Sequence, residues 1–117
     1  MIDLLELAAR IEAADAPDRA LFQRAGEAVY GQSHAGWPQN LHYAYEGCLA
    51  AEAWTSAAEM LVPEGWHTCF MHTGRHSGSC RWELRQRAGD SEESRAVTPG
   101  QALAAAAIRA HYAARAS

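Results

Sequence analysis

The chain has 117 residues, of which 49% are hydrophobic and 21% are charged, and its formal net charge is −4. This length favours one domain with a single core, so we expect an α+β domain that spans residues 1–117. The mild negative charge argues against a protein that engulfs nucleic acid, and no charge-free apolar stretch is long enough to cross a membrane.

Apolar residues recur every three or four positions near the N-terminus, as Leu4, Leu7, Ala8 and Ile11. This spacing places them on one face of a helix over residues 3–14. The first residues lack the basic start, the long apolar run and the cleavage site of a secretory signal. We therefore expect a cytoplasmic protein whose first element is an amphipathic helix.

A second helix is predicted to follow the break at residues 15–18. Asp15 or Ala16 can cap it, and Pro17 suits its first turn. The helix should end at Gly31, with a buried side of Leu21, Phe22, Ala25, Ala28 and Val29. Because the connecting loop is short, we expect the two helices to pack as an antiparallel hairpin.

Residues 31–54 leave two alternatives open. The first ten, GQSHAGWPQN, form a loop because Gly, Ser, Pro and Asn cluster there. The remainder can form a short strand over residues 41–45 or a helix that reaches Trp54. Ser56 and Glu59 then have the spacing of a capping box for one or two helical turns, and a turn at residues 63–65 follows.

From Trp66 onward the apolar period becomes two, which indicates β-strands. The return strand alternates Cys80, Trp82 and Leu84 with Arg81, Glu83 and Arg85, as in an antiparallel strand with one solvent-facing side. Pairing Phe70 with Trp82 and Thr68 with Leu84 brings the apolar sides of both strands together. The residues SRAV, at 94–97, can add a third short strand.

The last predicted element is an Ala-rich helix, with Thr98 as its cap and Pro99 at its first position. Its inner stripe should consist of Leu103, Ala104, Ala107, Ile108 and His111. The complete prediction is an α+β fold in which an N-terminal helical hairpin, a small antiparallel β-sheet and a C-terminal helix packed on that sheet form a sandwich.

Two motifs occur in a fixed order in the second half of the chain. LVPEGW occupies residues 61–66, and the helix that begins with Thr98 and Pro99 follows the predicted sheet. Together with LLELAARIEAADAPDRAL at residues 4–21, they resemble the phage ABA sandwich domain family of small phage and prophage proteins. The resemblance implies a small α+β sandwich, a phage or prophage origin and no assigned activity.

Histidine and cysteine are concentrated in HTCFMHTGRHSGSC, residues 67–80. In the predicted hairpin His72 faces Cys80, and His76 lies in a glycine-containing loop that can fold back towards them. These three side chains could form an open zinc site, whereas His67 and Cys69 fall on the opposite face of the strand. The alternative is a solvated hairpin tip without metal, because the spacings match no standard zinc finger.

A reactive thiol needs a base and a nearby positive charge, which Cys80 could find in His72 and Arg81. The alternative is an inert thiol, and Cys48 is predicted to belong to the core. The odd number of cysteines favours reduced thiols, and no GxGxxG, P-loop, GxSxG or HExxH motif is present. We therefore expect no catalytic activity and no cofactor, zinc at the hairpin tip being the alternative.

The charge is divided unevenly along the chain. Residues 1–65 contain three arginines and ten acidic residues, and residues 66–117 contain seven arginines and four acidic residues. Arg81, Arg85 and Arg87 share the outer face of the second strand and could contact phosphates, with Arg75 in the loop. Because Glu83 interrupts this patch, a solvated strand face is favoured over a nucleic-acid partner.

Four aromatic residues flank the ambiguous segment: Trp37, Tyr43, Tyr45 and Trp54. They form either a satellite core or a protein-binding surface, because Trp and Tyr are enriched at binding hot spots. A homodimer through the same region is equally compatible with the pattern.

The hypothesis that follows is a non-catalytic, phage- or prophage-encoded protein that binds a host or phage protein. An inhibitor of host defence, such as an anti-CRISPR protein, would have a comparable size and charge. A basic partner surface would then meet the acidic residues Glu46, Glu52, Glu59 and Glu64.

Overall fold

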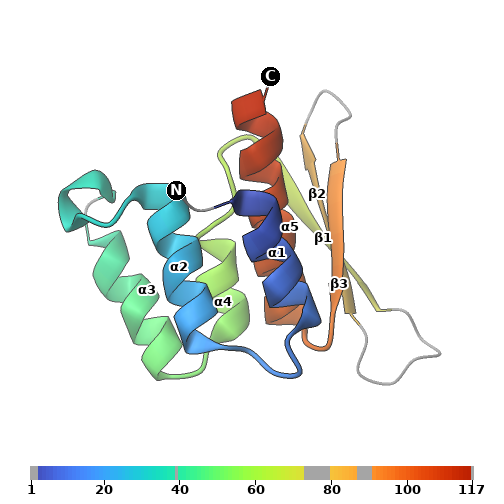
Figure 1. Ribbon diagram of the computed structural model, residues 1–117, viewed down its shortest axis with the longest axis horizontal. Coiled ribbons are helices and arrows are strands. Elements are labelled where there is room, and N and C mark those ends of the chain that lie inside the picture. The colour runs from blue at the N-terminus through green and yellow to red at the C-terminus, as the bar shows by residue number, and fades with distance from the viewer. Residues whose placement is uncertain (1–2, 39, 73–79, 87–90, 117) are drawn as a thin grey trace.

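The computed structural model describes residues 3–38, 40–72, 80–86 and 91–116. Five α-helices and three strands are described: α1 (Leu4–Ala13), α2 (Arg19–Tyr30), α3 (Leu41–Ala50), α4 (Trp54–Glu59), β1 (Trp66–His72), β2 (Cys80–Gln86), β3 (Ser91–Ala96) and α5 (Pro99–Ala116). A 3₁₀ turn, η1 (His34–Gly36), lies between α2 and α3. The α+β class is confirmed, with helices at the N-terminus and the last helix packed on the sheet (Figure 1).

Aspartate side chains begin the first two helices. The Asp3 carboxylate accepts hydrogen bonds from the backbone N–H groups of Leu5 and Glu6 at 3.0 and 3.3 Å. Asp18 caps α2 in the same way, and Gly31 ends α2 with φ of +97°. The predicted cap at Asp15 or Ala16 is therefore wrong, since Pro17 precedes the helix and Asp18 supplies the side-chain acceptor.

The ambiguous segment forms helices, so the alternative strand over residues 41–45 is wrong. Helix α3 ends at Ala50 rather than reaching Trp54, because Glu52 has a left-handed backbone (φ of 58°) that redirects the chain. The predicted capping box is also wrong. Helix α4 already begins at Trp54, its N-cap is Ala53 without a side-chain hydrogen bond, and Ser56 lies inside the helix.

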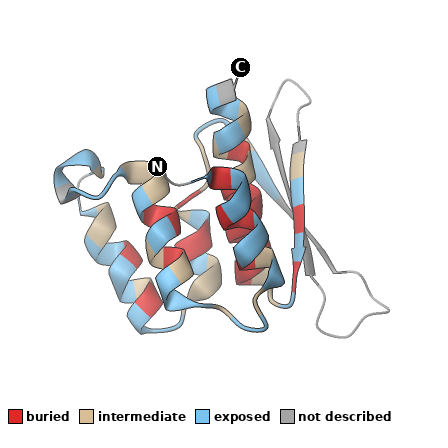
Figure 2. Ribbon diagram, viewed as in Figure 1, coloured by how far each residue is buried: buried red, intermediate tan, exposed pale blue. Residues whose placement is uncertain are grey.

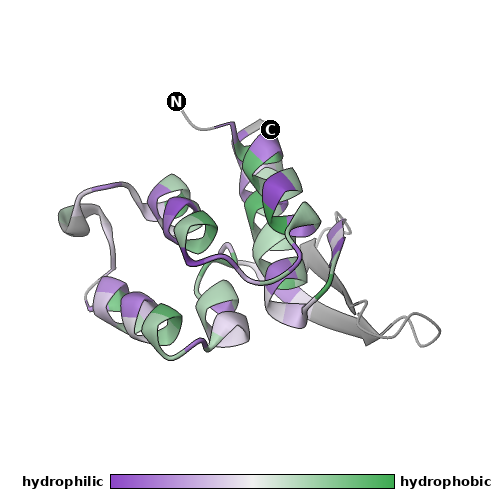
Figure 3. Cartoon of the chain, turned by 60° about the horizontal axis from the view of Figure 1, so that its bottom comes forward, coloured by the Kyte–Doolittle hydropathy of each residue, from purple (hydrophilic) through white to green (hydrophobic). Residues whose placement is uncertain are grey.

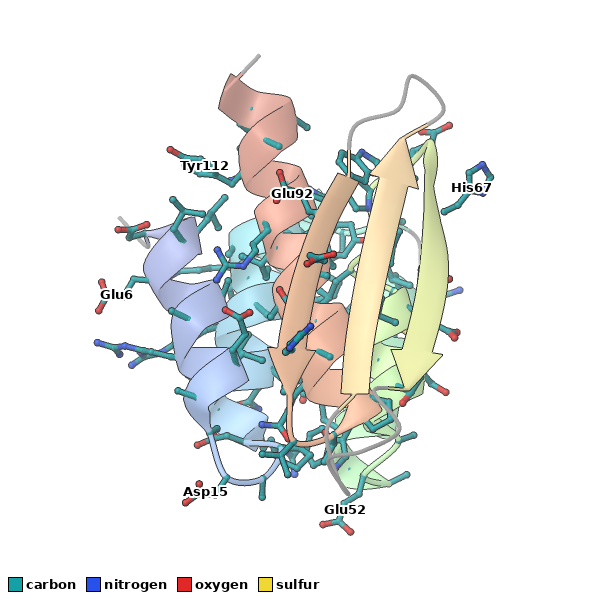
Figure 4. The ribbon with its side chains drawn as sticks, turned by 90° about the vertical axis from the view of Figure 1, so that its right-hand side faces the viewer. Glu6, Asp15, Glu52, His67, Glu92 and Tyr112 are labelled. Carbon is teal, nitrogen blue, oxygen red and sulfur yellow. The ribbon has the colours of Figure 1, made fainter. Side chains whose placement is uncertain are left out.

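The three strands form one antiparallel sheet in the order β1-β2-β3. The predicted register of the hairpin is confirmed, since Phe70 pairs with Trp82, Thr68 with Leu84 and His72 with Cys80. The third strand begins at Ser91, three positions before the predicted SRAV segment. In Figure 4 the sheet faces the viewer, and no helix of the described part of the chain lies in front of it.

Helix α5 lies at the centre of the molecule, between the sheet on one side and α1, α2 and α4 on the other. All residues at positions 101–108 are buried, which Figure 2 shows as an almost continuous red segment. The predicted single inner stripe was therefore too narrow, because α5 contacts neighbours on both sides. Its many alanines have no side-chain atoms beyond Cβ. The sheet and the other helices can therefore both pack closely against the same turns of α5.

Helix α3 lies on the opposite side of the molecule from the sheet. It packs against α2 and α4, and the loop after α2 joins α2 and α3 at one end (Figures 1 and 3). No helix within the described ranges is long and apolar enough to cross a membrane.

Candidate protein-binding surface

Helix α3 has an apolar side facing inward, and most of its outward-facing residues are uncharged. Tyr45 and Leu49 are buried, with 0% and 1% of their surface exposed, whereas 70% of the Tyr43 surface is exposed. The outward residues Tyr43, Ala44, Glu46, Gly47 and Ala50, which we call the α3 surface, are all exposed. The Tyr43 ring lies against that of His42 at 3.9 Å, and most of its surface is accessible to a partner.

Tyr45 belongs to the core, so its place in the predicted contact surface is wrong. Its hydroxyl donates a 2.5 Å hydrogen bond to the Phe22 carbonyl oxygen, and its ring lies 5.5 Å from that of Trp37. Burial, aided by the nearby negative charge of Glu46, raises the pKa of this phenol far above its usual value. The residue therefore ties α3 to α2 as a neutral group.

Trp37 and Trp54 are half-buried and have mainly structural contacts. The Trp37 indole N–H donates to the Gly31 carbonyl oxygen at 2.9 Å, and its ring lies 4.8 Å from that of Tyr30. Trp54 packs on Phe22 at a ring distance of 5.0 Å. Thus three of the four candidate aromatics belong to the main core or pack against it, rather than forming a satellite core, and Tyr43 is the one that is exposed.

The four acidic residues that the sequence suggested for a basic partner come from α3, from α4 and from the loops that follow these two helices. The carboxylates of Glu46, Glu52, Glu59 and Glu64 are all on exposed residues. The Arg19 guanidinium lies 3.7 Å from the Glu46 carboxylate, and both side chains are about half exposed. Such a surface pair contributes little to stability, so Glu46 can exchange this partner for another cation.

The predicted metal ligands are only partly within the described chain. The backbones of His72 and Cys80 face each other in the sheet, as predicted, but the structure does not describe their side chains. His76 lies outside the described residues, and among the described ones no group of three His, Cys, Asp or Glu side chains could hold a metal ion. Zinc binding at the hairpin tip thus stays a prediction.

The arginine patch is defined by backbone positions alone. Arg81 pairs with Arg95, whose side chain is exposed, and Arg85 pairs with the exposed His67. Arg75 and Arg87 lie outside the described residues. Of the cysteines, the structure places the side chain of Cys48, which packs partly buried against the core. Phosphate binding and thiol reactivity at Cys80 therefore stay predictions.

Polar side chains inside the helical layers hold the ends of other helices. Gln101 donates to the carbonyl oxygens of Ile11, in the last turn of α1, and of Ala14, its C-cap. Arg115 donates to the Ala28 carbonyl oxygen near the end of α2. Further contacts of this kind join Tyr30 to the Met60 carbonyl and His111 to the Leu61 carbonyl. Because carbonyl groups at helix ends lack partners within their own helix, these side chains have structural roles.

A pocket that was not predicted from the sequence lies next to the α3 surface, between α2 and α3. It is lined by Gln23 and Glu27 of α2 and by His42 and Glu46 of α3, with Trp37 from the loop between them. Each helix contributes residues four positions apart, a spacing that places two side chains on one face. That spacing was visible in the sequence, but the facing of the two helices was not.

Comparison with known proteins gave no relative. No protein-family model matches the chain, and neither a curated protein nor a solved structure matches it.

Proposed function

We propose that the chain is a small non-catalytic protein, encoded by a phage or prophage, that acts by binding another protein through the α3 surface. The single observation that carries this proposal is Tyr43, which is 70% exposed in the first turn of α3, a helix whose other face is in the core. Tyrosine offers a large contact area and loses little conformational entropy on binding, so it is enriched at binding hot spots.

The sequence and the charge distribution support a basic partner. The resemblance to the phage ABA sandwich domain family supports the phage origin, and with it a role in the cytoplasm of the host cell. The exposed carboxylates of Glu46, Glu52, Glu59 and Glu64 would attract a basic surface that normally holds nucleic acid. Inhibition of a host defence, as by anti-CRISPR proteins, is the more specific form of this proposal.

A site-specific photo-crosslinker tests the proposal. We would place p-benzoyl-phenylalanine at Tyr43 in one version of the protein and at Tyr112 in another. Tyr112 is a matched control, since it is 44% exposed but lies on α5. After illumination in host cells, we expect a defined crosslinked protein from position 43 and none from position 112.

Binding to the purified partner then separates a specific contact from an incidental crosslink. Tyr43→Ala should weaken binding by at least about tenfold, as expected for a hot-spot residue, whereas Tyr112→Ala should leave binding unchanged. Equal effects of both substitutions, or crosslinks of equal pattern, would refute the role of the α3 surface. A crosslink to a second copy of this chain would instead identify the homodimer alternative.

A further inference from the structure

The pocket between α2 and α3 has walls that are fixed by the fold. The indole of Trp37 is held by its hydrogen bond to the Gly31 carbonyl oxygen and by the ring of Tyr45 behind it. Gly26 of α2 permits this packing, because a Cβ at that position would lie 2.8 Å from the Trp37 ring. The pocket therefore exists before any ligand binds, which reduces the entropy lost on binding.

The charge of the lining selects a positively charged group. Two carboxylates, those of Glu27 and Glu46, line the pocket from opposite helices, and no arginine is among its lining residues. Arg19 lies outside this lining, and its guanidinium is already 3.7 Å from the Glu46 carboxylate. A phosphate or a nucleic acid would be repelled by this charge.

The size of the pocket favours a single side chain over a small-molecule ligand as its occupant. Its volume is about 200 Å³, below the roughly 300–1,000 Å³ typical of pockets that enclose small-molecule ligands. A metal ion is a poor alternative, since no three potential ligands come together among the described residues. A single long cationic side chain is the occupant that fits both the charge and the volume.

Arginine fits the lining better than lysine. Its planar guanidinium can bind a carboxylate with two parallel hydrogen bonds and can lie against an aromatic ring, whereas the ammonium of lysine is a compact, strongly hydrated charge. The pocket offers carboxylates and an indole together, and His42, another of its lining residues, has its ring 3.9 Å from that of Tyr43. The pocket is thus continuous with the exposed contact residue.

We infer that this pocket, together with Tyr43, is a docking site for an arginine side chain on the surface of a basic partner protein. The inference rests on the proposed function, because it names the chemistry of the same partner. In the complex, the guanidinium lies between Glu27 and Glu46, and the neighbouring residues of the partner cover the exposed ring of Tyr43.

Small probes test the pocket without knowledge of the partner. The probes are N-acetyl-arginine amide, the lysine analogue, and the citrulline analogue, which has a similar shape to arginine but no charge. Binding is followed by the NMR resonance of the Trp37 indole N–H. We expect a saturable shift with the arginine probe, a weaker effect with lysine and none with citrulline.

Substitutions assign the binding to the two carboxylates. Glu27→Gln and Glu46→Gln should each weaken arginine binding by about tenfold, the effect of losing one charge-assisted hydrogen bond. Glu6→Gln, at an exposed position of α1, is the matched control and should have no effect. Unchanged melting temperatures would show that all three variants fold.

The outcomes separate this inference from the proposed function. No saturable shift, or equal shifts with the arginine and citrulline probes, would refute the proposal that the pocket binds a cationic side chain. Equal binding of the lysine probe would refute the preference for a guanidinium group. Crosslinking from position 43 that persists in a Glu27→Gln, Glu46→Gln double variant would overturn the pocket and leave the proposed function standing. Arginine binding without any crosslink from position 43 would support the pocket and count against the proposed function.

Discussion

Gly100 lies so close to Trp54 that a Cβ at position 100 would be 2.6 Å from the Trp54 Cβ. The same Cβ would lie 2.9 Å from the Trp54 carbonyl carbon and 3.0 Å from the Thr55 amide nitrogen. These are mostly backbone atoms at the start of α4, and they cannot move without shifting the helix. The first turns of α4 and α5 therefore pack together only because position 100 is glycine.

Gly100→Ala should lower the free energy of unfolding by about 1–3 kcal/mol, in the range measured for overpacked sites. The higher helix propensity of alanine offsets part of this loss. Chemical denaturation followed by circular dichroism would measure the change. A variant as stable as the wild type would show that α4 and α5 can separate without loss.

Gly47→Ala is the matched substitution with the opposite expected sign. Gly47 lies inside α3, and a Cβ there would meet no atom within 4 Å. Alanine should therefore raise the free energy of unfolding by roughly 0.5–1 kcal/mol through helix propensity alone. The same denaturation experiment measures it, and a loss of stability would contradict the α3 geometry.

Gln101 should be essential for the junction of α1 and α5. Its side chain is 1% exposed, and its amide donates to the Ala14 carbonyl oxygen at 2.9 Å and to the Ile11 carbonyl oxygen at 3.2 Å. Gln101→Leu keeps the volume but leaves these acceptors without donors, so stability should fall by about 2 kcal/mol.

The control for this substitution is Gln32→Leu, at an exposed position of the loop after α2. It should change the free energy of unfolding by no more than about 0.5 kcal/mol. Hydrogen exchange adds a local measurement, since loss of the Gln101 amide should speed exchange in the last turn of α1. Equal stability of the two variants would contradict a structural role for Gln101.

Elements with a regular pattern could be predicted from the sequence. The hairpin register follows from the alternation of apolar and charged residues, because shifting a strand by one residue would turn its apolar side outward. Helix α1 follows equally from its spacing. Helix α3 did not, because Tyr43 points outward while Tyr45 and Leu49 point inward, so that apolar residues on both sides conceal the helical period.

The remaining differences have tertiary causes. Alanine is compatible with a buried or an exposed position, so the sequence of α5 cannot show that it is enclosed on both sides. Among the candidate site residues, Tyr43 and Tyr45 are the same amino acid two positions apart. Only the orientation of α3 decides that Tyr45 is buried in the core and Tyr43 is exposed to solvent. The pocket depends on how α2 faces α3, which no local pattern encodes.

The ion pair of Arg109 and Glu12 should stabilise the contact of α5 with α1. Both side chains are mostly buried, at 26% and 22% exposure, and Arg109 also donates to the Ser94 hydroxyl oxygen of β3 at 3.3 Å. Glu12→Gln removes the charge and keeps the shape. We expect a loss of roughly 1–2 kcal/mol in the free energy of unfolding, since this is a charge-assisted hydrogen bond with little solvent around it.

The exposed pair of Arg10 and Glu6 provides the control for this substitution. Their separation is 2.7 Å, but the side chains are 56% and 58% exposed. Glu6→Gln should therefore cost at most about 0.5 kcal/mol. Thermal denaturation of both variants side by side makes the comparison, and equal losses would argue against a special role for Arg109.

His111 should make the stability of the protein depend on pH. Its Nε2 is 2.6 Å from the Leu61 carbonyl oxygen, in a partly buried position beside the end of α4. Burial lowers the pKa of His111 below its ordinary value of 6.5 and outweighs the opposite effect of the hydrogen bond, and the nearby charge of Arg115 lowers it further. The folded state therefore favours the neutral ring.

The direction of the effect follows from proton binding. Below pH 6.5 the unfolded chain protonates His111 while the folded chain does not, so stability falls as the pH drops from that value through the lowered pKa of the folded state. Above pH 6.5 the contribution of His111 is complete. Denaturation at a series of pH values, compared with His111→Gln, measures it. The His111→Gln variant can still donate to the Leu61 carbonyl oxygen, so its stability should fall less than that of the wild type as the pH drops below 6.5. Identical pH profiles of the two proteins would contradict the prediction.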